Sequence, residues 1–146
     1  MNRHEFIKIC GGTCLGLIGI GSVLQSCGTT YLVEGTLNNN RLQIKKSDFI
    51  KVEKDQTKYR KYILVKTPSL DYPVVVYRNN ESTYTALLMR CTHQGNELNV
   101  SGDILTCPAH GSEFAKNGEV IQGPAEQNLT SYPVTIDQDK IYIQLS

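Results

Sequence analysis

Short apolar segments follow one another along the chain from Leu42 onward. Leu42 and Ile44 alternate with polar neighbours, and two further segments near the C-terminal end alternate in the same way around a polar turn. The other predicted strands are residues 62–65, 74–77, 84–89, 132–136 and 141–145. Runs of this length and period are typical of β-strands, and no window of the chain after residue 27 keeps the 3.6-residue period of an amphipathic helix. The pattern predicts an all-β domain, a sandwich or a small barrel.

The first residues have a different pattern. Arg3 and Lys8 precede sixteen uncharged residues, 9–24, that are mostly apolar. A cationic start followed by an apolar stretch is typical of a secretory signal peptide, and the stretch is shorter than the ~18–20 apolar residues that a membrane-spanning helix needs. The sequence therefore favours a signal peptide at residues 1–26, with a retained membrane anchor as the alternative.

The end of this segment, Leu24-Gln25-Ser26-Cys27, resembles the lipobox of bacterial lipoproteins. The resemblance implies a diacylglycerol on the Cys27 thiol, with residues 27–40 as a polar lipid tether. We therefore expect an exported protein that is lipid-anchored on the periplasmic side of a bacterial membrane. The start of the chain also resembles a twin-arginine export motif in which His4 replaces the second arginine, so the general secretory route is the alternative.

Charge narrows the choice of partners. The whole chain has a formal net charge of +1, and without residues 1–26 it holds 13 basic and 13 acidic residues. A neutral domain provides no basic field that would attract nucleic acid. We therefore expect no nucleic-acid partner, and we expect membrane contact to come from the tether and not from surface charge.

The rare residues form two pairs. Cys91 and His93 follow the pattern C-x-H, and thirteen residues later Cys107 and His110 follow the pattern C-x-x-H. Two thiolates and two imidazoles suit a tetrahedral zinc ion, although zinc sites usually pair their ligands at other spacings. They also suit a [2Fe-2S] cluster in which two histidines replace two cysteines on one iron. A metal centre is predicted, and a zinc-stabilised binding module stays open as an alternative.

The residues between and after these pairs favour two tight loops. Gly95 and Gly111 follow the two histidines and permit a close turn of the backbone. Residues 97–100 and 103–106 are predicted to pair as a hairpin across Ser101-Gly102, which would hold the two loops side by side.

The segments Cys91–Gly95 and Cys107–Phe114 resemble the two cluster-binding boxes of the Rieske [2Fe-2S] family. The resemblance implies that Cys91 and Cys107 bind one iron and that His93 and His110 bind the other. It also implies a Rieske domain over residues 41–146, in which an antiparallel β-sandwich or small barrel forms the base. The cluster-binding subdomain, about residues 90–127, is inserted into that base.

The same resemblance gives expected roles to residues around the cluster, with Gly95 and Gly111 shaping the loops. Ser112 would donate a hydrogen bond to a cluster sulfur, and Phe114 lacks the hydroxyl of the tyrosine that is a second donor in quinol-oxidising relatives. Pro124 would belong to a loop that covers the cluster. Asn96 and Ala109 stand where those relatives carry the cysteines of a disulfide between the loops.

Together these features predict a membrane-tethered [2Fe-2S] electron-transfer protein that passes single electrons between redox protein partners. We expect no catalytic site and no small-molecule substrate. An oxygenase needs a further iron held by two histidines and a carboxylate, and the chain after residue 26 has no histidines besides His93 and His110. The main alternative is a Rieske subunit of a larger oxidoreductase, either quinol-oxidising or arsenite-oxidase-like.

Overall fold

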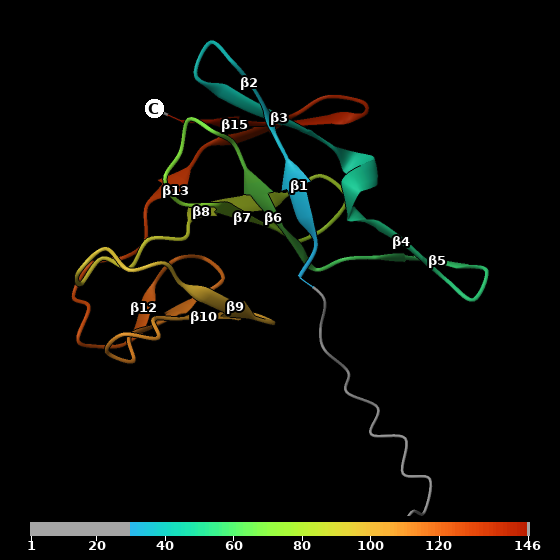
Figure 1. Cartoon of the computed structure of the whole chain (residues 1–146). Coiled ribbons are helices and arrows are strands. Elements are labelled where there is room, and N and C mark those ends of the chain that lie inside the picture. The colour runs from blue at the N-terminus through green and yellow to red at the C-terminus, as the bar shows by residue number, and fades with distance from the viewer. Residues whose placement is uncertain (1–29, 146) are drawn as a thin grey trace, which may run out of the picture.

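The computed structural model describes residues 30–145, whose regular secondary structure is almost entirely β-strand (Figure 1). The all-β prediction is confirmed. Among these residues no helix has the length and apolar character needed to cross a lipid bilayer. The predicted signal peptide and the predicted lipid attachment at Cys27 lie outside the described residues.

A five-stranded sheet lies at the centre of the fold. Its strands, in spatial order, are β1 (Leu32–Glu34), β6 (Tyr62–Lys66), β7 (Val74–Arg78), β8 (Tyr84–Leu88) and β13 (Ser131–Tyr132). All neighbours in this sheet are antiparallel except β1 and β6, which run parallel.

Two four-stranded sheets accompany the central one. The first contains β14 (Val134–Ile136), β15 (Lys140–Gln144), β3 (Arg41–Lys45) and β2 (Thr36–Asn38). The second contains β12 (Val120–Gln122), β11 (Glu113–Ala115), β10 (Ile104–Thr106) and β9 (Asn99–Ser101), and it lies within the predicted cluster-binding subdomain. After β3, the short 3-10 helix η1 (Lys46–Phe49) leads into a separate hairpin of β4 (Ile50–Glu53) and β5 (Gln56–Tyr59).

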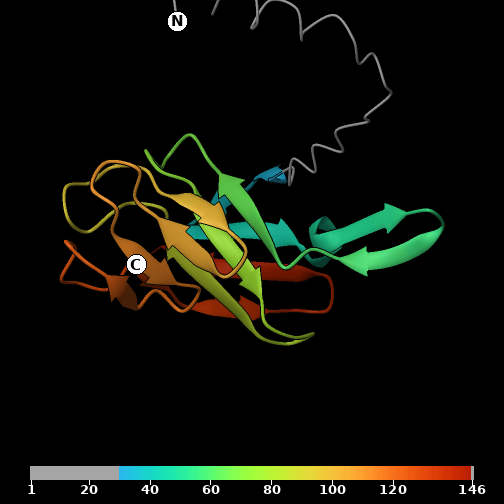
Figure 2. The same cartoon turned by 90° about the horizontal axis from the view of Figure 1, so that it is seen from below.

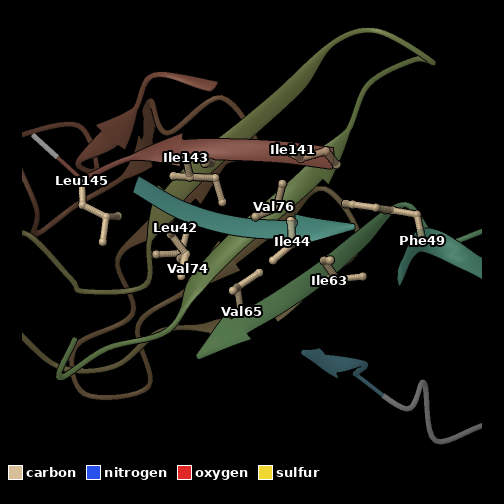
Figure 3. Close-up of a cluster of buried hydrophobic side chains, with 11 residues drawn as sticks. Leu42, Ile44, Phe49, Ile63, Val65, Val74, Val76, Ile141, Ile143 and Leu145 are labelled. Carbon is tan, nitrogen blue, oxygen red and sulfur yellow. The ribbon is translucent and has the colours of Figure 1, made fainter. Parts of the chain in front are cut away.

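The central sheet is covered on both faces, which explains the continuous apolar run at residues 74–77. Val74 and Val76 join one core, and Val75 and Tyr77 join another. The first core fills the space against the β14–β15–β3–β2 sheet (Figure 3). Its buried members are Leu42, Ile44, Phe49, Ile63, Val65, Val74, Val76, Ala86, Ile141, Ile143 and Leu145. Since successive side chains of a strand point to opposite faces, a strand buried on both sides must be apolar throughout.

The second core joins the central sheet to the subdomain that contains the Cys and His pairs. Leu87 and Met89, from β8 and its end, lie against Leu98, Leu105 and Phe114. Cys91 and Cys107 belong to the same buried cluster. The two cysteines are therefore positioned by the hydrophobic packing of the subdomain on the sheet.

Within the predicted tether, residues 27–40, the structure differs from the sequence prediction at residues 32–38. Leu32–Glu34 pairs in parallel with Leu64–Lys66, and Thr36–Asn38 pairs with Arg41–Gln43. The chain thus joins the folded sheets before residue 41. These strands have only three residues each, which is too short for a period of two to identify them.

Pro133 divides what the sequence predicts as one strand at residues 132–136. Ser131–Tyr132 pairs with β8 in the central sheet, whereas Val134–Ile136 pairs with β15 in the outer sheet. Proline has no N–H to donate to a ladder, so the change of sheet takes place where no backbone hydrogen bond is lost.

A substitution at Gly35 tests whether β1 and β2 belong to the fold. A Cβ at this buried position would lie 2.5 Å from Leu42 Cδ1 and 2.7 Å from Val65 Cγ1. We expect Gly35→Ala to lower the free energy of unfolding by about 1–3 kcal/mol, the usual cost of overpacking a core. Urea unfolding measures the change, with the exposed neighbour variant Thr36→Ala as the control. Equal stability of the two variants would contradict the packing described here.

Candidate metal centre

The two loops that carry the Cys and His pairs are built alike. In the first loop the Gly95 N–H donates to the Cys91 carbonyl at 2.8 Å, and in the second the Gly111 N–H donates to the Cys107 carbonyl at 3.0 Å. In both loops the cysteine N–H donates back to the carbonyl of the residue after the glycine, at 2.8 Å. Each loop is therefore a closed turn that begins at its cysteine.

Both glycines adopt a backbone conformation that other residues avoid. The φ angles are +79° at Gly95 and +77° at Gly111, in the left-handed region where a Cβ causes strain. The predicted role of the two glycines in tight loops agrees with these angles. In the first loop the Arg90 guanidinium also lies against Gly95, where an added Cβ would be 3.2 Å from Arg90 Nε.

The fold brings the four predicted ligands together as two pairs. Cys91 and Cys107 are each 2% exposed, and their side chains are within hydrogen-bonding contact. The rings of His93 and His110 meet edge to face with their centroids 5.0 Å apart. His110 is exposed and His93 is half-buried. The thiols thus form the inner pair of the site and the imidazoles the outer pair.

The polar atoms at the site fit a metal centre. His93 Nδ1 is buried and has no hydrogen-bond partner, a property that among the described residues it shares only with the Tyr77 hydroxyl. A buried polar atom without a partner is costly unless it binds something. No three His, Cys, Asp or Glu side chains of residues 30–145 converge on one point as ligands of a single ion. Two thiols beside two imidazoles match the donor set of a two-iron cluster with two histidine ligands.

The surroundings of Cys107 favour its thiolate form. Burial tends to raise the pKa of the thiol, but the N–H groups of Ala109 and His110 and contact with Cys91 outweigh it. The pKa of Cys107 is lowered as a result. Metals bind cysteine as the thiolate, so a lowered pKa assists binding.

Residues 122–127 form a third segment of the site. The Ser112 hydroxyl is fully buried and accepts a hydrogen bond from the Ala125 N–H at 3.0 Å. Gln122 Nε2 donates to the Gly111 carbonyl at 3.2 Å, so two bonds join this segment to the second loop. The Gly123–Pro124 peptide bond is cis, and Pro124 is exposed at the surface. The segment predicted to cover the cluster therefore lies beside the loops.

Thr92 joins the same segment to the first loop. Its Oγ1 donates to the Gln127 carbonyl at 2.6 Å, across 35 residues of sequence. Sequence reasoning missed this contact because a backbone carbonyl 35 residues away leaves no mark in the residue pattern. Neither Asn96 nor Ala109 can form a disulfide, so these side-chain hydrogen bonds and the hydrophobic core hold the loops together.

A valine at position 92 tests this link. Thr92→Val keeps the side-chain shape and removes the hydroxyl, which costs about 0.5–1.5 kcal/mol of loop stability. We expect the bound metal centre to be lost about two- to tenfold faster on warming, followed by visible absorbance. Thr36→Val, at an exposed position of β2, is the matched control. Identical rates for the two variants would show that the Thr92 bond has no such role.

Comparison with known proteins agrees with this geometry. Residues 45–133, which include both loops and the covering segment, match the Rieske [2Fe-2S] domain. No relative is found among the curated proteins.

Several solved structures are similar to the chain. The cyanobacterial plasma membrane Rieske protein PetC3 from Synechocystis PCC 6803 is 31% identical, with 57% of this chain and 85% of that chain covered and a TM-score of 0.49. A chain from the complex of reduced oxygenase and oxidized ferredoxin in carbazole 1,9a-dioxygenase is 23% identical over 59% of this chain and 82% of that one, with a TM-score of 0.47.

Dicamba monooxygenase is 28% identical over 59% of this chain but only 29% of its own length, with a TM-score of 0.43. The domain match over residues 45–133 carries the assignment, and it implies a Rieske-type [2Fe-2S] cluster and a role in electron transfer. The chain therefore belongs to the Rieske [2Fe-2S] domain family.

Proposed function

We propose that this protein is a membrane-tethered carrier that passes single electrons between redox proteins. The observation that carries the proposal is the pairing of two buried thiols with two outward imidazoles at one end of the fold. In the proposed site Cys91 and Cys107 hold one iron, and His93 and His110 hold the other. When bound, the [2Fe-2S] cluster supplies a one-electron redox couple.

In the proposed site the cysteines hold the metal centre inside the protein and the histidines bring it to the surface. Cys91 and Cys107 keep the sulfur side of the site within the hydrophobic core and away from water. The exposed ring of His110 and the half-buried ring of His93 lie nearest to solvent, where a redox partner would dock. An outward imidazole edge shortens the path for an electron between the two proteins.

The Ser112 hydroxyl can both accept and donate a hydrogen bond. Its oxygen accepts from the Ala125 N–H, so its own proton is left to donate, and we propose a cluster sulfur as the acceptor. Phe114 has no hydroxyl and is fully buried. With one hydroxyl donor in place of two, we expect a reduction potential below the top of the Rieske range, about +300 mV.

The chemistry of the chain supports a carrier and not a catalyst. Its histidines are His4, His93 and His110, and the latter two belong to the proposed cluster site. An oxygenase-type mononuclear iron would need two more. The same reasoning supports redox proteins, and not a small molecule, as the partners.

The proposed location rests on the N-terminal sequence. The apolar residues 9–24 and the lipobox-like Leu24-Gln25-Ser26-Cys27 support export and a lipid anchor on the periplasmic side of a bacterial membrane. Mass spectrometry of the N-terminal peptide from membrane-purified protein tests this. A diacylglyceryl Cys27 is expected, and a peptide that still begins at Met1 would contradict it.

Metal analysis tests the redox proposal. The purified protein should contain two irons and two acid-labile sulfides per chain, and reduction by dithionite should produce the electron paramagnetic resonance signal of a Rieske cluster. Zinc without sulfide would overturn the proposal in favour of a structural metal site. Copurification of haem or molybdenum subunits would place the chain in a larger oxidoreductase.

A further inference from the structure

Charge is unevenly distributed over this nearly neutral domain. Residues 45–61 contain seven basic and three acidic side chains. The basic ones are Lys45, Lys46, Lys51, Lys54, Lys58, Arg60 and Lys61. Residues 90–127, which carry the proposed cluster site, contain two basic and five acidic side chains. Net neutrality therefore conceals a cationic region and an acidic region.

These two regions lie at opposite ends of the molecule. The β4–β5 hairpin extends away from the three larger sheets (Figure 1). Seen from below, the hairpin is at one end of the long axis, and the yellow and orange loops of the metal centre are at the other (Figure 2). Within the described chain, β4 and β5 pair only with each other. The hairpin thus presents both of its faces to its surroundings.

The register gives the hairpin an apolar face. Ile50 lies opposite Tyr59, and Val52 lies opposite Thr57, so these four side chains share one face. Val52 is 72% exposed, Tyr59 55% and Ile50 38%. Apolar side chains that stay this exposed on a hairpin form a patch, and such patches mark contact sites.

The opposite face of the hairpin is cationic. Lys51 lies directly opposite Lys58, and both reach Glu53, at 2.5 Å and 3.3 Å. One carboxylate shared by two lysines leaves a positive excess on this face, and at the tip the charges of Lys54 and Asp55 offset each other. Both ion pairs are exposed, so each is easily exchanged for a contact with another anion.

More cations surround the base of the hairpin. A depression of about 540 Å³ beside Ile50 and Tyr59 has four cations and two carboxylates in its lining, namely Lys45, Lys46, Arg78, Lys140, Glu81 and Asp139. None of the three lysines forms a salt bridge within residues 30–145, so cations are in excess there. The Arg78 guanidinium lies over the Tyr59 ring at 4.2 Å, and the Arg60 guanidinium lies over the Tyr31 ring at 3.9 Å. Exposed aromatic and apolar groups beside lysines and arginines suit the boundary between water and lipid.

The N-terminal end of the described chain reaches this same region. Tyr31 and Leu32 are 41% and 53% exposed, and Arg60, directly after β5, stacks on Tyr31. Cys27 is three residues before Thr30, a distance of at most about 10 Å even in an extended chain. A lipid on Cys27 would therefore hold the base of the hairpin close to the bilayer.

We propose that the β4–β5 hairpin and the cations at its base form a membrane-contact surface that rests on anionic phospholipid headgroups. The proposal depends on the tether of the proposed function for its proximity to the bilayer, and on charge complementarity for its choice of lipid. In this orientation the metal centre, at the opposite end, faces away from the membrane towards water-soluble partners.

An introduced tryptophan can report the membrane contact by its fluorescence, because the chain has no tryptophan of its own. Val52→Trp places one on the apolar face of the hairpin, and Ile121→Trp, at a 54% exposed position of β12, is the matched reporter at the metal-centre end. The full-length protein, purified from membranes, is reconstituted into phosphatidylcholine vesicles with and without phosphatidylglycerol. We expect a blue shift and quenching by brominated lipid at position 52 only, and only with phosphatidylglycerol.

Removing lysine charges tests whether electrostatic attraction to the lipid causes the hairpin contact. Each lysine near an anionic surface contributes about fivefold to partition, so Lys51→Gln/Lys58→Gln should weaken hairpin contact by roughly 30-fold and abolish the shift. Lys66→Gln/Lys116→Gln removes the same charge elsewhere and should leave the shift intact. Raised salt should also abolish the blue shift of the Val52→Trp protein, because it screens the charges of the lysines and the lipid.

The outcomes separate this proposal from the tether. Protein that floats with both kinds of vesicle but shows no lipid-dependent change at position 52 overturns the membrane-contact surface and leaves the tether standing. Protein that floats only with phosphatidylglycerol and shows the shift overturns the tether and supports the surface. Protein that floats with neither kind of vesicle overturns both the tether and the membrane-contact surface. A water-soluble protein partner would then be the better occupant of the hairpin.

Discussion

Replacing Cys107 by alanine should abolish the visible absorption of the cluster and the electron paramagnetic resonance signal of the reduced protein. The proposed site has only two thiolates, so one iron loses half of its protein ligands, and no other cysteine lies among the described residues except Cys91. Iron and sulfide content, measured on protein purified in parallel with the native chain, quantifies the loss. Cys27→Ala, which removes a cysteine outside the site, should keep full cluster content.

Unfolding does not account for the expected loss. The core between the central and outer sheets contains no residue of either loop, so the β-sheet circular dichroism of Cys107→Ala should persist. A Cys107→Ala protein that keeps its cluster would contradict the ligand assignment. A protein that loses both cluster and sheet signal calls for the milder variant Cys107→Ser, which should give the same loss of cluster in a folded chain.

Removing the hydroxyl of Ser112 should lower the reduction potential by about 65–130 mV. A hydrogen bond to a charged group contributes about 1.5–3 kcal/mol, and a one-electron couple changes by about 59 mV for each tenfold change in equilibrium. The reduced cluster carries the additional negative charge, so loss of a donor disfavours reduction and the sign is negative. Protein-film voltammetry of Ser112→Ala measures the shift.

A matched variant separates the donor from the packing. Ser112→Ala also loses the bond from the Ala125 N–H, and so loosens the segment at residues 122–127. Thr92→Val loosens the same segment through the Gln127 carbonyl, but removes no hydroxyl that we place beside a cluster sulfur. We expect its potential to stay within about 20 mV of the native value, less than a threefold change in equilibrium. Equal shifts in the two variants would assign the effect to loop position and not to the Ser112 hydrogen bond.

Patterns confined to a few neighbouring residues could be predicted well. The strand at residues 74–77 is buried on both faces and β-branched in three of its four residues, and this composition leaves little alternative to a central strand. The predicted hairpin between the two loops is present, but its turn is Gly102-Asp103, one residue later than predicted, so that Ile104 lies opposite Ser101. The cysteine and histidine pairs indicated metal chemistry by residue type and spacing alone.

Features that depend on distant neighbours could not be predicted in this way. The strands at residues 32–38 are defined by their partners at residues 41–43 and 64–66 and not by their own pattern. Residues 51–61 mix lysines with acidic residues, a composition typical of a solvated, charged surface. They are exposed, but much of the segment is a hairpin with an apolar face and a cationic face, which only the register of β4 against β5 reveals.

The sequence by itself determined the all-β class and predicted the four donors of the metal centre, because strand periodicity and ligand type are properties of adjacent residues. The tertiary structure decided the rest. It placed the thiols inside and the imidazoles outside, joined Ser112 and Thr92 to residues 125 and 127, and separated the cationic hairpin from the acidic subdomain. Burial, hydrogen-bond partners and the direction of a charge distribution depend on which distant segments become neighbours, and only folding establishes those neighbours.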